Sequence, residues 1–413
     1  MKKYLLPLLM IGLLFAVFGF AAWLNSILIP YFQITLELST VQTTLVTFSF
    51  FIAYVVMALP SSWLLKKIGF KQGIVLGLVI MAIGTLLFIP AAYSRTYWMF
   101  LSGLFVLGTG QALLQTAANP YITILGPIES AAQRNSFMGV CNKVAGIASQ
   151  RLVGPLLLVN ADLLLQKLGK MTASEKLLSL NEMSLRIVNP YWLMTFALLL
   201  IAIIMWLIKL PVVNDEENNS DENGETRANV WLYPNLILGV FALFCAEGLE
   251  SITSYYIIPF GQGMGFSTSG SQPFVDYIIY AMLGGYICGI IFIPKYISQG
   301  KALAYSSFIG ICLALVALFS SGFIAVLCVI LMGFSNAFNW PCIWPLAIGG
   351  VGKFTKTASA MLIMAIAGDA LFPVLFAQLN ISFGKNGGIL LLLGLYAVIF
   401  YFGTLGHKKK TWI

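Results

Sequence analysis

The sequence predicts an all-helical integral membrane protein with about twelve transmembrane helices arranged as two six-helix bundles. Three observations support this prediction. Hydrophobic residues form 59% of the 413-residue chain and charged residues only 9%, with a mean hydropathy of +0.91, whereas soluble domains carry about 25% charged residues. The apolar residues gather in runs of about 20, the length that crosses a bilayer as a helix. An acidic stretch separates six such runs from six others.

Each run is continuously apolar and lacks the ten-residue alternation of a membrane β-barrel, so we expect helices. The first run continues through Pro30 without a small-residue cleavage site, so we interpret it as a retained helix and not as a signal peptide. The predicted helices span residues 5–30, 42–65, 73–93, 98–126, 135–160, 190–211, 230–258, 273–294, 302–322, 324–348, 358–381 and 387–406.

Basic residues predict the orientation. Placing both termini inside puts about fifteen lysines and arginines in the cytoplasm and about six outside, as the positive-inside rule requires. We therefore expect a multi-pass protein of the cell inner (cytoplasmic) membrane with both termini cytoplasmic. Residues 212–229 are acidic and lack apolar anchors, which predicts a disordered cytoplasmic linker between an N-terminal bundle, 1–211, and a C-terminal bundle, 230–413. The external stretch 161–189 is partly apolar, and we expect a short interfacial helix there.

The stretch 115–142, QTAANPYITILGPIESAAQRNSFMGVCN, places polar and charged groups inside membrane-length apolar runs. Such groups are costly in a bilayer, so they mark a solute or ion pathway or join helices as hydrogen-bonding contacts. The two halves also resemble each other. Asn119-Pro120 and Trp340-Pro341 each precede a helix end, a polar loop and a new helix. Parallel repeats of this kind are typical of the two halves of major-facilitator transporters.

Specific motifs add a family resemblance that runs from the first predicted helix to the last. They are WLNSILIPYFQ (23–33), YVVMALPSSWLLKKIGFKQGIVLGL (54–78), LFIPAAYSRTYWMFLSGLF (87–105), LQTAANPYITILGP (114–127), CAEG (245–248) and FNWPCIWPLAIGGVGKFTKTASAMLIMAIAGDALFP (338–373). The sequence resembles the fucose/galactose/glucose–proton symporter family of the major facilitator superfamily. The resemblance implies the major-facilitator fold and the proton-driven import of neutral sugars.

The chain departs from that family at the positions that carry protons. The resemblance implies an acid in a helix 1 motif LND and a glutamate in a helix 4 motif LETAANP. Here the matching residues are Ser26 and Gln115, and neither side chain titrates near neutral pH. The family's helix 5 glutamine matches Gly139, while its asparagine one turn on matches Asn142. The usual coupling residues therefore cannot be transferred, and the sugar-binding face of helix 5 is reduced to Asn142.

Three carboxylates remain as candidates for binding a coupling ion. Glu247 and Glu250 are three residues apart on the seventh predicted helix and so share a face. Glu247 also matches the family's AE step, and a buried acid there has the chemistry of a proton carrier. The alternative is a structural ion pair or hydrogen bond. Asp369 lies in the middle of the eleventh predicted helix, in GDA.

Two cations on the fifth predicted helix leave the charge of the solute open. Lys143 and Arg151 are eight residues apart, about two turns, so both can project along one face. As buried cations they need partners. One interpretation pairs them with Glu247 or Asp369. In the other, one of them binds a carboxylate or phosphate of the solute, which would be an organic acid, an acidic sugar or a carboxylate siderophore.

Amide and tryptophan side chains complete the predicted cavity, because aromatic faces stack on sugar rings and amides bind hydroxyl groups. The candidate substrate-binding residues are Trp23, Asn25, Ser26, Gln115, Asn119, Asn142, Lys143, Arg151, Asn339 and Trp340.

The leading hypothesis is a secondary transporter that imports a small polar solute, a sugar or sugar derivative, by alternating access. The alternatives are an importer or facilitator of an anion and a transporter-derived sensor. We expect no enzyme activity, because no nucleophile–base pair, metal-ligand cluster or phosphate-binding loop is found. We expect a monomer in membrane lipid, with no cofactor, no metal and no nucleic acid, and with a proton or sodium as the coupling ion.

Overall fold

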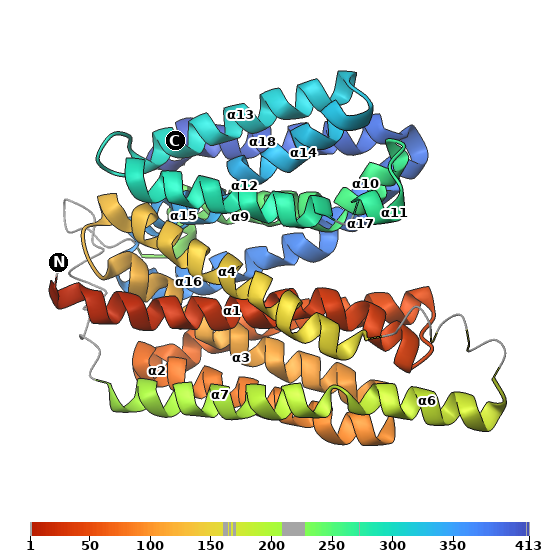
Figure 1. Ribbon diagram of the computed structural model, residues 1–413. Helices are drawn as coiled ribbons and strands as arrows, with labels where there is room; N and C mark the ends of the chain where they lie inside the picture. The colour runs from red at the N-terminus through yellow and green to blue at the C-terminus, as the bar shows by residue number, and fades with distance from the viewer. Residues whose placement is uncertain are drawn as a thin grey trace. The chain divides into compact units, whose positions relative to one another are not determined.

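A computed structural model describes residues 2–159, 164, 167, 171–208, 228–271, 273–409 and 411–412, and every regular element among them is helical (Figure 1). The α-helices are α1 (Lys2–Thr35), α2 (Thr40–Ser94), α3 (Tyr97–Ile124), α4 (Ala131–Leu157), α6 (Ala173–Leu185), α7 (Val188–Leu207), α9 (Pro234–Tyr255), α10 (Ile257–Gly263), α11 (Thr268–Ser271), α12 (Pro273–Phe292), α13 (Gln299–Phe319), α14 (Gly322–Asn336), α15 (Asn339–Ile348), α16 (Thr355–Met364), α17 (Gly368–Phe383) and α18 (Lys385–Thr404). Short 3-10 helices lie at η1 (Ile128–Ser130), η2 (Val230–Leu232), η3 (Gly352–Phe354), η4 (Ala365–Ala367) and η5 (Gly406–Lys408).

The membrane-spanning segments agree with the predicted twelve. Ten helical stretches of the described chain are long and apolar enough to cross a membrane. One of them, within α2, covers two predicted spans that meet at Gly69, whose backbone is not helical (φ 78°, ψ 169°). The helix α4 is not among the ten, because Arg134, Lys143 and Arg151 lower its hydropathy. With the second crossing of α2 and with α4, the number reaches twelve.

Contacts within the chain define two compact units. The N-terminal unit comprises Leu9–Ala118 and Cys141–Pro211, and the C-terminal unit comprises Met1–Leu8, Asn119–Val140 and Val212–Ile413. The helices α3 and α4 therefore each contribute one part to each unit. The predicted linker, 212–229, lies almost entirely outside the described residues, and the predicted bundle boundaries stay predictions.

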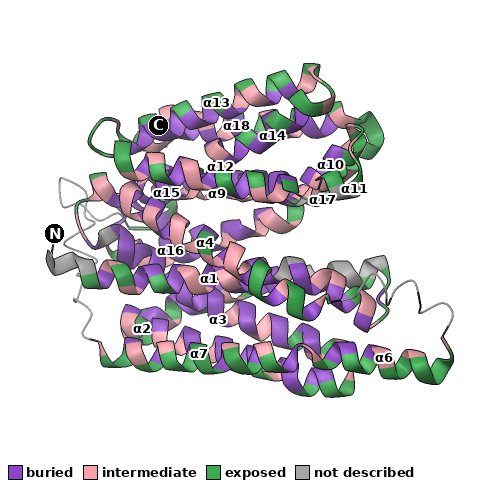
Figure 2. Ribbon diagram, viewed as in Figure 1, coloured by how far each residue is buried: buried purple, intermediate pink, exposed green. Residues whose placement is uncertain are grey.

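In the N-terminal unit α2 packs along α7 (Figure 1). One face of α7 carries exposed apolar side chains at helical spacing, among them Leu193, Phe196, Leu200 and Ile203, each more than half exposed (Figure 2). An apolar face of this size is stable only against lipid or another apolar surface. The helix α6 lies within the stretch 161–189, where a short helix was predicted; its interfacial position stays a prediction.

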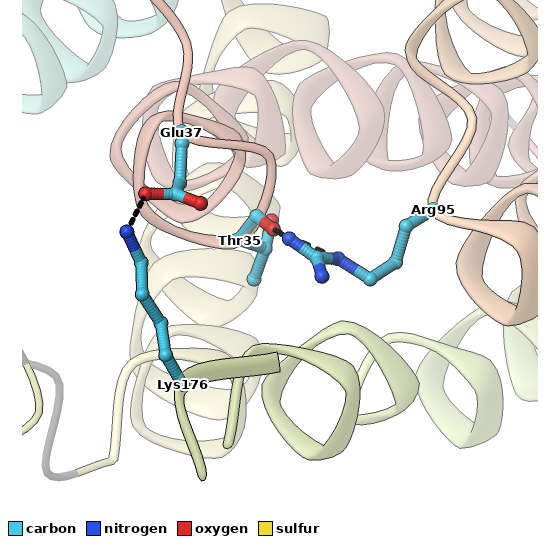
Figure 3. A network of polar contacts seen from close by, with 4 residues as sticks. All are labelled: Thr35, Glu37, Arg95 and Lys176. Carbon is cyan, nitrogen blue, oxygen red and sulfur yellow. Dashed lines mark hydrogen bonds and ion pairs between the residues drawn. The ribbon is translucent and has the colours of Figure 1, made fainter. Parts of the chain in front are cut away.

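A polar network in the N-terminal unit holds the C-terminal end of α1 (Figure 3). The Arg95 guanidinium donates to the Thr35 carbonyl from Nε at 3.1 Å and from Nη2 at 2.6 Å, and Lys176 on α6 pairs with Glu37. Carbonyl groups at the end of a helix have no partner within the helix, so Arg95 supplies a missing donor. Arg95 and Glu37 both adopt positive φ, 47° and 53°, a conformation that ordinary residues hold only when surrounding contacts fix it.

In the C-terminal unit α9 is central and contacts α15, α17 and α18, while α12 and α13 both pack on α14. Close helix contact requires glycine at one crossing in particular. A Cβ on Gly368 would lie 2.1 Å from the Phe244 carbonyl oxygen, so α17 and α9 can approach only with glycine there.

Arg134 secures the loop between α3 and α4, also within the C-terminal unit. Its guanidinium donates to the carbonyls of Ile122 at 2.9 Å and Thr123 at 2.6 Å and to the Ser130 hydroxyl at 2.6 Å. Arg134 therefore binds the last carbonyls of α3.

Candidate solute-binding site

Lys143 of the N-terminal unit is buried against an aromatic ring. Its Nζ lies 4.9 Å from the centroid of the Trp23 ring, and the two residues are 4% and 6% exposed. A cation over an aromatic face is stabilised by the ring quadrupole. The structure thus brings together two predicted site residues, Trp23 from α1 and Lys143 from α4.

Gln115 is 9% exposed, and its Nε2 donates to the Tyr54 hydroxyl at 3.1 Å. Tyr54 was not predicted as a site residue, because a tyrosine in an apolar run carries no signal of its polar partner. One turn earlier, Gln111 donates to the Phe18 carbonyl at 3.3 Å, while its own Oε1 is buried without a partner among the described residues. Amide groups on α3 therefore hydrogen-bond to α1 and α2.

Asn142 lies where α4 crosses α1 within the same unit. Its Nδ2 donates to the Phe15 carbonyl at 3.4 Å, and a Cβ on Gly19 would come within 2.0 Å of the Asn142 carbonyl oxygen. Glycine at position 19 thus permits the crossing. The predicted site residues Asn25 and Ser26 belong to α1, but their side chains lie outside the described part of the structure.

Arg151 corrects one expectation. Lys143 and Arg151 were expected to be two buried cations on one face of a helix, but Arg151 is exposed whereas Lys143 is buried. The reason is position, since Arg151 lies two turns further along α4, towards its C-terminal end. Of these two cations, Lys143 alone is buried.

The C-terminal unit contains a second group of predicted residues. Trp340 on α15 donates from Nε1 to the Asn119 Oδ1 at 3.3 Å, and its ring stacks on Trp344 with centroids 5.2 Å apart. Asn339 is 3% exposed, and neither of its amide atoms has a partner among the described residues. A buried amide without a partner is costly, so Asn339 is available to bind a ligand hydroxyl or an ordered water.

Glu247 and Glu250 are both half-buried on α9. A residue that was not predicted, Tyr286 of α12, is 5% exposed. Its ring lies against Gly139 of α4, where a Cβ would come within 2.4 Å of Tyr286 Cε1. The only sequence signal was the glycine at a position where the resembling family has glutamine.

Asp369 lies near the middle of one apolar helical stretch, Gly352–Phe383, as the sequence predicts. The 3-10 turn η4 lies within this stretch, just before α17 begins at Gly368. The role of Asp369 in binding a coupling ion stays a prediction.

Comparisons with known proteins agree with this architecture. The family model described as Major Facilitator Superfamily matches residues 11–373. The chain is 34% identical over 412 residues to a glucose/galactose transporter of Brucella abortus, covering 99% of this chain and 96% of the relative. It is 27% identical to the L-fucose-proton symporter of Escherichia coli, covering 99% and 95%.

The fold also matches a crystal structure of FucP, a major facilitator superfamily transporter, in the outward conformation. The TM-score is 0.85 at 27% identity, covering 97% of this chain and 98% of that one. The chain belongs to the major facilitator superfamily, in its fucose/galactose/glucose–proton symporter family, and it is a multi-pass membrane transporter and not an enzyme.

Proposed function

We propose that the protein imports a neutral sugar of hexose size together with protons across the cytoplasmic membrane, with both termini in the cytoplasm. The observation that carries this proposal is full-length similarity to a glucose/galactose transporter and to an L-fucose-proton symporter. The Trp340 ring, which donates to the Asn119 amide and stacks on Trp344, supports it, because ring faces and amides suit the apolar faces and hydroxyls of a sugar.

Proton coupling is proposed to use the carboxylates of α9. Ser26 and Gln115 occupy the positions of the family's acids and cannot carry a proton near neutral pH. Glu247 and Glu250 are half-buried on the same helix, and a carboxyl group in such a place can be tuned to bind and release a proton. Asp369 is a further candidate, because it lies near the middle of the apolar helical stretch Gly352–Phe383.

The alternative that the transported solute is an anion has less support. Lys143 lies against the Trp23 ring and is almost fully buried, while Arg151 is exposed. Arg151→Gln is therefore expected to leave neutral-sugar uptake unchanged. Selective loss of a carboxylate solute in this variant would support the anionic alternative.

The proposed function is tested with the purified protein. D-galactose, D-glucose and L-fucose are compared with galacturonate, citrate and ferric citrate in a thermal-shift assay, since a ligand that binds only the folded state raises apparent stability. Uptake of each stabilising solute into proteoliposomes is then measured with and without an inward proton gradient. We expect stabilisation by a neutral sugar and accumulation only with the gradient. Stabilisation by carboxylates alone would refute the sugar proposal, and gradient-independent equilibration would refute proton coupling.

A further inference from the structure

The junction between α14 and α15, within the C-terminal unit, interrupts a membrane-length helix. The helix α14 ends at Asn336, inside the apolar helical stretch Gly322–Ile348, and α15 begins at Asn339. Between them the Phe338 N–H donates to the Ser335 carbonyl at 3.3 Å, three residues back, as in a 3-10 turn. Irregular backbone at membrane depth is tolerated where it is buried in protein or lines a cavity.

Asn336 is the centre of a buried hydrogen-bond chain that joins α18, α14 and α9. The Tyr396 hydroxyl donates to Asn336 Oδ1 at 2.7 Å, and Asn336 Nδ2 donates to Thr253 Oγ1 at 3.1 Å. Thr253 Oγ1 in turn donates to the Leu249 carbonyl of its own helix at 2.8 Å. Asn336, Tyr396 and Thr253 are 2%, 0% and 1% exposed. Each bond in such a chain polarises the next, and the low dielectric of the interior strengthens all of them.

Packing against α13 holds the first member of this chain. A Cβ on Gly310 would lie 2.3 Å from Tyr396 Cε1 and 2.5 Å from Cζ, so the ring lies directly on the backbone of α13. Only glycine at position 310 leaves room for it. The Tyr396 hydroxyl therefore reaches Asn336 from a ring that is fixed in place.

Gln299, another buried amide of this unit, uses its polar atoms differently. Its Oε1 accepts from the Ala132 backbone N–H at 3.0 Å, and its Nε2 donates to the Ile128 carbonyl at 2.8 Å. Both of these partners are main-chain groups. The partners of Asn336 are side chains, so three particular residues on three helices are needed to hold the end of α14.

The end of α14 sets the position of two proposed sugar-binding residues. Asn339 and Trp340 are the first two residues of α15, three and four positions after Asn336. Asn339 is 3% exposed, and no hydrogen bond within the described part of the chain holds either of its amide atoms. The backbone that precedes Asn339 therefore determines where its amide lies.

We propose that Asn336 is a positioning residue for the solute, which holds the junction between α14 and α15 so that Asn339 and Trp340 can bind the sugar. Tyr396 and Thr253 fix the Asn336 amide, and this amide fixes the start of α15. The inference rests on the proposed function, because it assumes that α15 binds a neutral sugar. It predicts a change in KM with little change in the maximal rate, since the chain of bonds acts on binding geometry.

The first test removes one hydroxyl. Thr253→Val keeps the shape of the side chain but removes the acceptor of the Asn336 amide, whereas Thr253→Ser keeps the hydroxyl. Each variant is reconstituted in proteoliposomes, and D-galactose transport is measured over a range of concentrations. In Thr253→Val we expect KM to rise about fivefold, the effect of losing one buried hydrogen bond, with the maximal rate almost unchanged. Thr253→Ser should restore the wild-type KM.

Thr195 on α7 provides a matched control in the N-terminal unit. It is 4% exposed, its hydroxyl lies 2.9 Å from the Thr85 hydroxyl, and it donates to the Tyr191 carbonyl one turn back at 2.8 Å. Thr195→Val thus removes the same kind of buried bond, here between α2 and α7, which carry none of the proposed solute-binding residues. We expect it to lower the unfolding temperature about as much as Thr253→Val does and to leave KM unchanged.

The second test asks whether Tyr396 acts through Asn336. Tyr396→Phe removes the donor to Asn336 Oδ1 and should raise KM several-fold. The same change made together with Asn336→Leu should raise KM no further than Asn336→Leu alone, because residues of one hydrogen-bond network are not additive. An equal rise caused by Tyr396→Phe with and without Asn336 would overturn the central role of Asn336.

The outcomes separate the two proposals. Wild-type protein that transports no neutral sugar refutes the proposed function. Wild-type transport of D-galactose with an unchanged KM in Thr253→Val refutes the positioning role alone. A similar rise of KM in Thr253→Val and Thr195→Val also overturns it, because a general loosening of the protein would then explain both.

Discussion

The guanidinium of Arg95, just after the C-terminal end of α2, binds the carbonyl oxygen of Thr35 at the last residue of α1 with two hydrogen bonds (Figure 3). The Thr35 carbonyl has no acceptor role inside its own helix, and Thr35 is 1% exposed. The charged guanidinium thus supplies hydrogen-bond donors to a buried carbonyl at the end of α1. Arg95 adopts a positive φ in this arrangement.

Arg95→Gln should lower the free energy of unfolding by about 1.5–3 kcal/mol, the usual contribution of a hydrogen bond to a charged group. Thermal unfolding in detergent measures the change. Lys176→Gln is the matched control, because Lys176 and Glu37 are 37% and 50% exposed and an exposed ion pair contributes about 0–1 kcal/mol. Equal destabilisation by both variants would contradict the assignment.

Gly69→Ala should destabilise the protein through the backbone alone. Gly69 has φ 78° and ψ 169°, and a Cβ there would meet nothing within 4 Å. That region is essentially restricted to glycine, and a residue forced into it costs about 1–3 kcal/mol. The measurement is thermal unfolding beside Gly394→Ala, whose Cβ also meets open space without a positive φ. A stability equal to that control would show that the bend relaxes at no cost.

Glu247→Gln should abolish accumulation driven by a proton gradient and leave sugar exchange intact, because glutamine keeps the shape of the side chain but cannot carry a proton. Uptake and counterflow of radiolabelled D-galactose in proteoliposomes separate the two activities. The same two assays on Glu250→Gln show which of the two acids carries the proton. Full accumulation in both single variants and in the double variant would exclude this pair as the coupling site.

Trp340→Phe should raise the KM for a neutral sugar several-fold with a smaller change in the maximal rate. Phenylalanine keeps an aromatic face towards Trp344 but loses the Nε1 donor to Asn119. Transport kinetics over a range of sugar concentrations give both constants. Trp98→Phe is the control, since Trp98 is 70% exposed. An unchanged KM would place Trp340 outside the sugar site.

Much of the fold is readable from the sequence because a bilayer demands long apolar runs and internally satisfied backbones. The runs gave the helices and their number, and the family motifs gave the superfamily. Exact boundaries depend on single residues. Only the backbone of Gly69 separates two spans within one continuous α2, and the 3-10 turn η4 divides the single apolar stretch Gly352–Phe383 into α16 and α17.

The candidate site was less predictable because its contacts join residues far apart in the chain. Gln115, Asn119 and Trp340, which were predicted to bind the solute, form side-chain hydrogen bonds within the protein, and their role in solute binding stays a prediction. The contact between Gly139 and Tyr286 could not be predicted from the sequence. Glycine has no side chain that would indicate a partner, and a tyrosine in an apolar helix is common. Arg151 was predicted to be buried like Lys143, because both residues project along one face of the helix. It is exposed, because helical periodicity predicts the direction of a side chain but not its depth of burial.

The bonds of Gln299 have an evolutionary consequence. Both of its partners, the Ala132 N–H and the Ile128 carbonyl, are main-chain groups that almost any amino acid would present equally well. Selection that preserves this contact therefore acts on the Gln299 side chain alone. The residues at positions 128 and 132 can vary without a compensating change at position 299. Among homologous sequences such a contact would leave no covarying pair, only a single invariant glutamine.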